Sequence, residues 1–159
     1  MLRIAGTIEE SFVDGPGVRY TIFCQGCLLN CKGCQNPQTH SLSGGILVSI
    51  DDLFNDIQKY KLVSGVTFSG GEPSLQAKEL LELAKRLQES GYNIWMYSGY
   101  TIENLIKKPD VLELLKYIDV LVDGPYIESE KTLDLPFRGS KNQRLINVKE
   151  YLNGRYSIG

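Results

Sequence analysis

The sequence has 159 residues, of which 42% are hydrophobic and 23% are charged, and its formal net charge is −2 at pH 7. This amount of apolar material is enough for one core, and we expect a single domain spanning residues 1–159. A slightly acidic chain has no overall positive field for nucleic acid or an anionic membrane, and no run in the sequence approaches the ~18 apolar residues of a membrane helix. Neither partner is expected.

Strands and helices are predicted in alternation. Runs of β-branched and aromatic residues predict strands, and apolar residues three or four apart predict helices. In chain order the predicted elements are a strand at 18–25, a helix capped by Ser49, a strand at 65–69, a helix at 74–90, a strand at 93–98, helical residues between 102 and 117 that Pro109 divides, a strand at 119–123 and a weaker strand within 144–148.

This alternation predicts an α/β fold with a curved sheet of mostly parallel strands. A complete eight-stranded barrel takes ~250 residues, so the chain supplies a partial (βα) barrel that stays open on one side. Ligands in such folds bind at the C-terminal ends of the strands. The segments that follow the predicted strands should therefore converge on one site: 26–37, 70–72, 98–100 and 123–124.

All four cysteines lie between positions 24 and 34, directly after the first predicted strand. The N-terminus has early acidic residues and no apolar signal core, so we expect a cytoplasmic protein. Disulfides are rare in that reducing compartment. Clustered cysteines there are expected to bind metal or to carry out redox chemistry.

Cys27, Cys31 and Cys34 have the spacing C-x3-C-x2-C, for which three interpretations exist. They would be buried on one face of a helix, but the surrounding glycines and proline disfavour a helix. With Cys24 they form two C-x2-C pairs for zinc, although only three residues separate the pairs. Alternatively, three thiolates hold a [4Fe-4S] cluster and leave one iron open to another ligand. Cys24 is then expected to be a small buried hydrophobe.

The spacing C-x3-C-x2-C resembles that of the radical S-adenosylmethionine superfamily. In that superfamily S-adenosylmethionine chelates the open iron, and its reductive cleavage gives a 5′-deoxyadenosyl radical. Residues 14–27, DGPGVRYTIFCQGC, are similar to the signature of glycyl-radical-enzyme activases, as are Asn36 and Pro37. The tail LVDGPYIESEKTLDLPFRGSKNQRLINV resembles that of the activases that act on anaerobic ribonucleoside-triphosphate reductase.

The resemblance implies that the chain abstracts hydrogen from a glycine of the catalytic subunit of that reductase. A [4Fe-4S] cluster and S-adenosylmethionine are the implied cofactors, flavodoxin or ferredoxin is the implied electron donor, and no side chain is catalytic. The implied metal ligands are Cys27, Cys31 and Cys34. The implied cofactor-binding residues are Gln35, Asn36, Gly70, Gly71, Glu72 and Ser98. Gln35 departs from the superfamily, which often has an aromatic residue there for adenine.

Simpler interpretations of several residues stay open. Glu72 also suits the cap of a helix after a tight turn, and Ser98 and Asp123 also suit turns. In the tail, Arg138 and Arg144 are either solvated or paired with a carboxylate. Two other functions remain: a small-molecule radical enzyme similar to 7-carboxy-7-deazaguanine synthase, which should lack the D-G-P-G signature, and an iron–sulfur electron carrier, which needs no S-adenosylmethionine.

Overall fold

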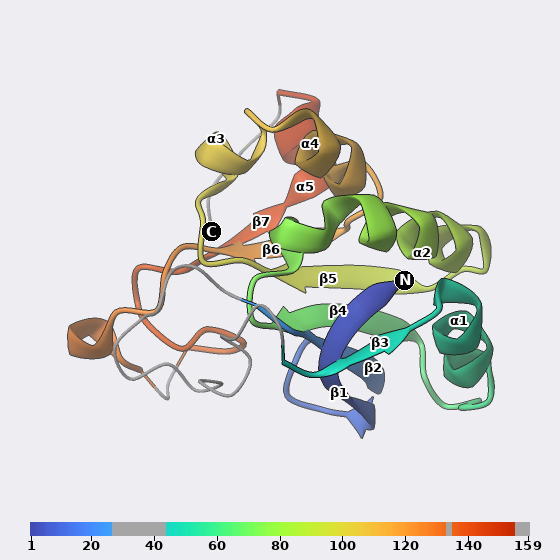
Figure 1. Cartoon of the computed structure of the whole chain (residues 1–159). Coiled ribbons are helices and arrows are strands. Elements are labelled where there is room, and N and C mark those ends of the chain that lie inside the picture. Colours follow the sequence, from blue (N-terminus) through green and yellow to red (C-terminus); the bar gives the residue numbers. More distant parts are fainter. Residues whose placement is uncertain (27–43, 133–134, 155–159) are drawn as a thin grey trace.

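The computed structural model describes residues 1–26, 44–132 and 135–154 (Figure 1). The three proposed metal ligands lie outside the described residues, as do two of the proposed cofactor-binding residues, Gln35 and Asn36. None of the helices in the described part of the chain is long and apolar enough to cross a membrane.

The strands of the described residues form one seven-stranded sheet. They are β1 (Leu2–Ser11), β2 (Arg19–Cys24), β3 (Ile46–Val48), β4 (Gly65–Gly70), β5 (Asn93–Tyr97), β6 (Val120–Asp123) and β7 (Arg144–Asn147). Their order across the sheet is β3-β1-β2-β4-β5-β6-β7. The four central strands β2, β4, β5 and β6 are parallel, which confirms the predicted α/β class, and the flanking strands β1, β3 and β7 pair antiparallel.

The helices between β3 and β6 begin and end close to their predicted positions, whereas η3 and α5 were not predicted. They are α1 (Ile50–Gln58), η2 (Pro73–Gln76), α2 (Ala77–Glu89), α3 (Ile102–Leu105), α4 (Pro109–Leu115), η3 (Glu128–Glu130) and α5 (Val148–Leu152). Ser49 caps α1 as predicted, since its Oγ accepts from Asp52 N at 3.0 Å. Pro109 is the first residue of α4, where its missing N–H is not needed, and thus separates α4 from α3.

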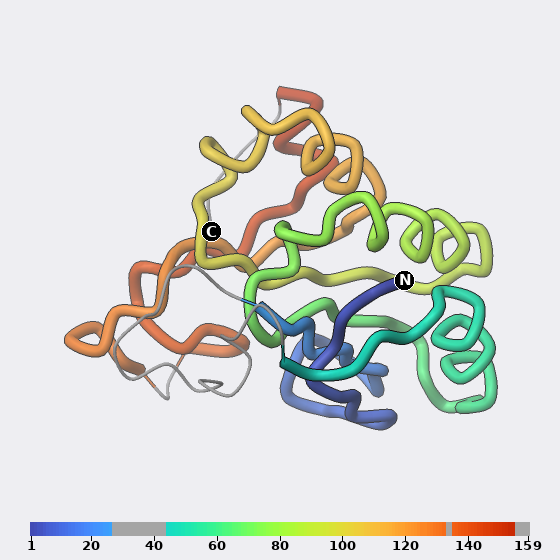
Figure 2. The backbone as a smooth tube through the Cα atoms, in the orientation of Figure 1, coloured from blue at the N-terminus to red at the C-terminus, as the bar shows by residue number. Residues whose placement is uncertain are grey.

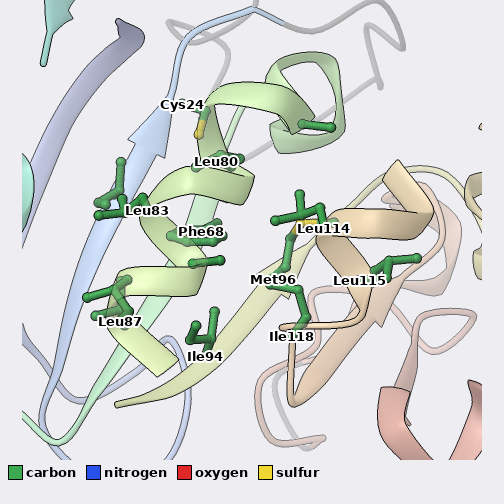
Figure 3. Packing of buried hydrophobic residues seen from close by; sticks show 14 of the residues in the cluster. Cys24, Phe68, Leu80, Leu83, Leu87, Ile94, Met96, Leu114, Leu115 and Ile118 are labelled. Atoms are coloured by element: carbon green, nitrogen blue, oxygen red, sulfur yellow. The ribbon is translucent and has the colours of Figure 1, made fainter. Parts of the chain in front are cut away.

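The hydrophobic core lies between the helices and one face of the central strands. Figure 3 shows Leu80, Leu83 and Leu87 of α2 pointing toward Phe68 of β4 and Ile94 of β5. All five side chains are fully buried. The residues whose spacing predicted the helix, Ala77, Leu80, Ala84 and Leu87, are all buried. The core thus fixes α2, and the turn that precedes it, on the sheet.

Strands β1 and β3 were not predicted. Glu9 and Glu10 interrupt the apolar pattern of β1, and its pairing with β2 has irregularities after Ile4 and after Ile8. A strand with such bulges loses the regular alternation that identifies strands in a sequence. β3 has only three residues, two of which are exposed apolar side chains. Both strands extend the parallel core on the β2 side.

Candidate functional site

The described residues that follow the central strands meet at one edge of the sheet, as predicted, while residues 27–37 of the first segment lie outside the described part of the chain. The chain leaves β4 and β5 at the same edge, seen in the tube of Figure 2. Gly71 N donates to Cys24 O at 2.8 Å, which joins the ends of β2 and β4. Ser98 N donates to Val122 O at 2.9 Å, which joins the ends of β5 and β6.

The Glu72 carboxylate lies at the centre of this edge. Glu72 is 1% exposed. Its Oε2 accepts from Ser98 Oγ at 2.7 Å, from Ser74 Oγ at 2.7 Å and from Ser74 N at 3.3 Å. Its Oε1 accepts from Gly99 N at 2.7 Å. The structure therefore brings together the predicted residues Glu72 and Ser98, and it also realises the simpler role of Glu72, because the Ser74 N–H that Glu72 binds belongs to the first turn of η2.

Burial raises the pKa of Glu72 above its usual value, and hydrogen bonds from Ser74, Gly99 and Ser98 oppose that shift. Each carboxylate oxygen has two lone pairs. Oε1 accepts one hydrogen bond from the described residues, whereas Oε2 accepts three. No described residue uses the second acceptor position of Oε1. A buried carboxylate with an unused acceptor position fits the N–H donors of an amino group.

The backbone of Glu72 is bonded to the start of the cysteine segment. Glu72 N donates to Gly26 O at 2.7 Å, and Cys27 is the next residue. The first proposed cluster ligand is therefore one peptide bond away from a residue held by Glu72. This juxtaposition fits a cofactor that binds to both a cluster and a carboxylate.

Gly70 has a structural reason to be glycine. Its φ is +93°, and a Cβ at this position would lie 2.5 Å from Cys24 N. Only a residue without a side chain lets β4 end this close to β2. The structure thus explains Gly70 by its contact with Cys24, and a role for Gly70 and Gly71 toward a cofactor stays a prediction.

Cys24 is a core residue, as expected. Its side chain is 0% exposed, and burial, with a smaller contribution from Glu72, raises the pKa of its thiol to about 12. A thiol with this pKa is protonated at neutral pH, and the thiolate is the form that binds metals. Within the described ranges, no group of three or more His, Cys, Asp or Glu side chains is placed to hold a metal ion.

Asp123 and Arg144 form an ion pair. From the sequence, pairing with a carboxylate was one of two possibilities for Arg144. Asp123 is 0% exposed; its Oδ1 accepts from Arg144 Nε at 2.9 Å and its Oδ2 from Ile102 N at 2.7 Å. Arg144 also pairs with Glu103, and these two carboxylates raise the pKa of the guanidinium. Asp123 thereby fixes the start of α3, and its charge is paired with that of Arg144.

Arg19 of the D-G-P-G-x-R segment is a buried residue whose role the sequence did not reveal. It is 1% exposed, and burial lowers its pKa to about 10. It donates to Thr67 Oγ1 at 2.8 Å, to Val66 O at 3.0 Å and to Asn93 O at 3.1 Å. A Cβ on Gly15 would lie 2.6 Å from the Arg19 side chain. This glycine of the signature therefore makes room for the arginine.

Residues 13–146 match the family described as "4Fe-4S single cluster domain". The chain is 36% identical to the anaerobic ribonucleoside-triphosphate reductase-activating protein of Haemophilus influenzae, with 86% of this chain and 92% of that protein covered. Identity to the protein of the same name from Escherichia coli K12 is 32%, with 82% and 89% covered. The pyruvate formate-lyase-activating enzyme of Staphylococcus aureus is 37% identical, with 89% of this chain but 59% of that enzyme covered.

One solved structure, QueE from Escherichia coli, resembles the fold. Its TM-score is 0.50 at 22% sequence identity, with 63% of this chain and 53% of QueE covered. At this identity the likeness bears on the fold alone. It agrees with an α/β sheet whose central strands are parallel and whose edges remain open.

Proposed function

The chain belongs to the 4Fe-4S single cluster domain family and to the anaerobic ribonucleoside-triphosphate reductase-activating proteins, and from this membership we propose that it generates a glycyl radical in a partner polypeptide. The partner is the catalytic subunit of anaerobic ribonucleoside-triphosphate reductase. The cofactors are a [4Fe-4S] cluster and S-adenosylmethionine. When bound, they supply the 5′-deoxyadenosyl radical that removes a hydrogen atom from the glycine Cα.

The observation that carries the proposal is the hydrogen bond from Glu72 N to Gly26 O, 2.7 Å long. It holds the start of the cysteine segment against the residue whose carboxylate has an open acceptor position. In the superfamily the α-amino group and the carboxylate of S-adenosylmethionine chelate iron, and the same α-amino group has N–H donors for that acceptor position. The electron carrier needs no S-adenosylmethionine. The small-molecule radical enzyme would share both features, but it should lack the D-G-P-G signature that this chain has at residues 14–17.

In the proposed reaction the chain's own residues bind and orient the two cofactors. We propose that the thiolates of Cys27, Cys31 and Cys34 hold the cluster and that the backbone of Gln35 and Asn36 contacts adenine. Glu72 accepts from the amino group through Oε1. The hydroxyl proton of Ser98 is committed to Glu72 Oε2, and we therefore assign Ser98 to fixing the carboxylate.

Electron supply and cellular setting are also part of the proposal. Three of the four cysteines are assigned to one cluster and Cys24 is buried, so electrons reach this cluster directly from an external donor, a flavodoxin or ferredoxin. A reducing cytoplasm keeps the proposed thiolate ligands free of disulfides. We propose that residues 1–159 act as one domain in this reaction.

Anaerobic incubation with S-adenosylmethionine, reduced flavodoxin and the reductase subunit tests the proposal. Electron paramagnetic resonance should show a glycyl doublet on the reductase, and a reductase variant with its radical glycine changed to alanine should show none. Turnover of a small nucleotide precursor without the reductase would support the small-molecule enzyme instead. No cleavage of S-adenosylmethionine by the reduced protein would support the electron carrier.

A further inference from the structure

The tail segment 138–144 forms a turn that its own amide side chains hold rigid. Gln143 Oε1 accepts from two backbone N–H groups of the turn, and Gln143 Nε2 donates to Gly124 O at 3.1 Å. Asn142 Nδ2 donates to Pro125 O at 2.8 Å. The turn is thereby attached to the chain that leaves β6. A turn braced in this way presents its remaining side chains at little cost in conformational entropy.

The two arginines of the turn differ in what they bind. Arg144 is committed to Asp123 and Glu103. Arg138 forms no ion pair with any carboxylate of the described residues, and its only hydrogen bond there is a long one, from Nη1 to Gln143 O at 3.4 Å. Its Nε is buried and has no hydrogen-bond partner in the described part of the chain. The guanidinium therefore has unused donors in a prearranged position.

The unused donors of Arg138 form one edge of the guanidinium. Nη1 faces the carbonyl of Gln143, which leaves Nε and Nη2 without an acceptor among the described residues. The N–H groups on this edge are parallel and match the two oxygens of a carboxylate. A carboxylate is thus the acceptor that this edge fits. Nε is buried and Nη2 is not, so a carboxylate from outside would first meet Nη2.

The position of Arg138 favours a macromolecule as the source of that carboxylate. Arg138 is half-buried on a surface turn, between the exposed residues Pro136 and Lys141. Its neighbour Phe137 packs edge-on against Trp95 of β5, with ring centroids 5.1 Å apart. The turn thus lies beside the strands whose ends carry the Glu72 site, and it is reachable from outside the molecule.

We propose that Arg138 binds a carboxylate of the partner polypeptide, from an aspartate, a glutamate or the C-terminus, and so orients the target glycine toward the site. This inference rests on the proposed function. Arg138 is then a recognition residue for the protein substrate, while Arg144 in the same turn is structural.

The test compares Arg138→Gln with Arg138→Lys and with Lys141→Gln, a matched loss of one positive charge in the same turn. All are used as holoenzymes with full-length reductase subunit. The rate of glycyl-radical formation is measured against reductase concentration, and S-adenosylmethionine affinity and cleavage are measured without reductase. Arg138→Gln should raise the KM for reductase about tenfold or more, as expected for loss of a charge-assisted pair. Arg138→Lys should recover part of this loss, and Lys141→Gln should stay within about twofold of wild type.

Two results would overturn the inference. An unchanged KM for reductase in Arg138→Gln would show that the guanidinium meets no carboxylate there. Weaker S-adenosylmethionine binding with an unchanged KM for reductase would assign Arg138 to the carboxylate of the cofactor. Both results require a wild-type enzyme that forms the glycyl radical, so failure of the proposed function is recognised separately, by the absence of that signal in the wild type.

Discussion

The sharpest test of the site is the substitution Glu72→Gln, which removes one charge and keeps the size of the side chain. Glu72 is buried, and one acceptor position on its Oε1 is open. A hydrogen bond to a charged group contributes roughly 1.5 to 3 kcal/mol. We therefore expect the Kd for S-adenosylmethionine to rise about 10- to 150-fold, while the cluster remains.

The affinity for S-adenosylmethionine should also depend on pH, through the protonation of Glu72. Burial raises the pKa of Glu72, so the carboxylate becomes protonated at a higher pH than an exposed glutamate does. The ionised carboxylate accepts the stronger hydrogen bond from the amino group of S-adenosylmethionine. Affinity should be full above the raised pKa and should fall as the pH drops through it. In Glu72→Gln this fall should be absent, because glutamine does not titrate.

The free energy of unfolding should change with pH in the direction opposite to the affinity. An unfolded glutamate has a pKa of about 4.3, and the raised pKa in the folded state means that the folded protein binds more protons above that value. The free energy of unfolding therefore declines as the pH rises from the unfolded pKa through the folded one. Glu72→Gln should lack this decline, as urea denaturation at several pH values can measure.

Calorimetric titration of the anaerobic, reconstituted protein measures the affinity. Glu82→Gln is the matched control, because Glu82 is exposed on α2. It should change neither the affinity nor its pH dependence. If Glu72→Gln binds S-adenosylmethionine as tightly as wild type at all pH values, Glu72 serves only to cap η2 and to anchor Ser98, and the amino group binds elsewhere.

Three further outcomes are expected. Reconstitution of the wild type should give about four irons per chain, and alanine at any one of the three proposed cysteine ligands should abolish this iron binding. Cys24→Ala should retain the iron in iron and sulfide analysis. Iron loss from Cys24→Ala alone would contradict the assignment. Arg144→Met should lower the free energy of unfolding in urea by about 3 kcal/mol, since it leaves the buried Asp123 unpaired. Lys149→Met loses a more exposed pair with Asp119 and should lower it by no more than about 1 kcal/mol. Equal losses in the two variants would refute the structural role of Arg144. The visible absorbance of the cluster should fade in air, and a cluster stable to oxygen would argue against an open iron.

The central strands and the α helices between them were predictable because burial imposes regular patterns on them. Residues 65–69 form a continuously buried strand, and α2 repeats its leucines at helical spacing. β1 escaped prediction because its pairing is irregular, and β3 because three residues carry too little pattern. Neither strand contributes a side chain to the Glu72 site, so the location of the site was predictable without them.

The sequence indicated which residues carry polar or charged groups near the site better than it indicated their hydrogen-bond and ion-pair partners. The tail suggested that Arg144 meets a carboxylate, but Asp123 and Glu103 are 21 and 41 residues away in the chain. Spacing along the chain carries no information on pairs that form only when β6 and β7 align. The hydrogen bond between Ser98 and Glu72 joins the ends of two strands in the same way.

The D-G-P-G-x-R signature illustrates how the far end of a strand can set the geometry of the site. β2 and β4 pair in register from Arg19 opposite Gly65 to Cys24 opposite Gly70. At the first pair a Cβ on Gly65 would collide with the Arg19 guanidinium, and at the last a Cβ on Gly70 would collide with the backbone of Cys24.

If β4 slipped by one residue against β2, a residue with a side chain would stand where Gly65 or Gly70 is needed. The same slip would also move every side chain of β4 to the opposite face of the sheet. The two glycines therefore fix the alignment of β2 with β4. The same alignment brings Gly26 O to Glu72 N just beyond the last pair. The buried arginine, which lies at the opposite end of β2 from the site, thus helps to determine where the cysteine segment begins relative to the Glu72 carboxylate.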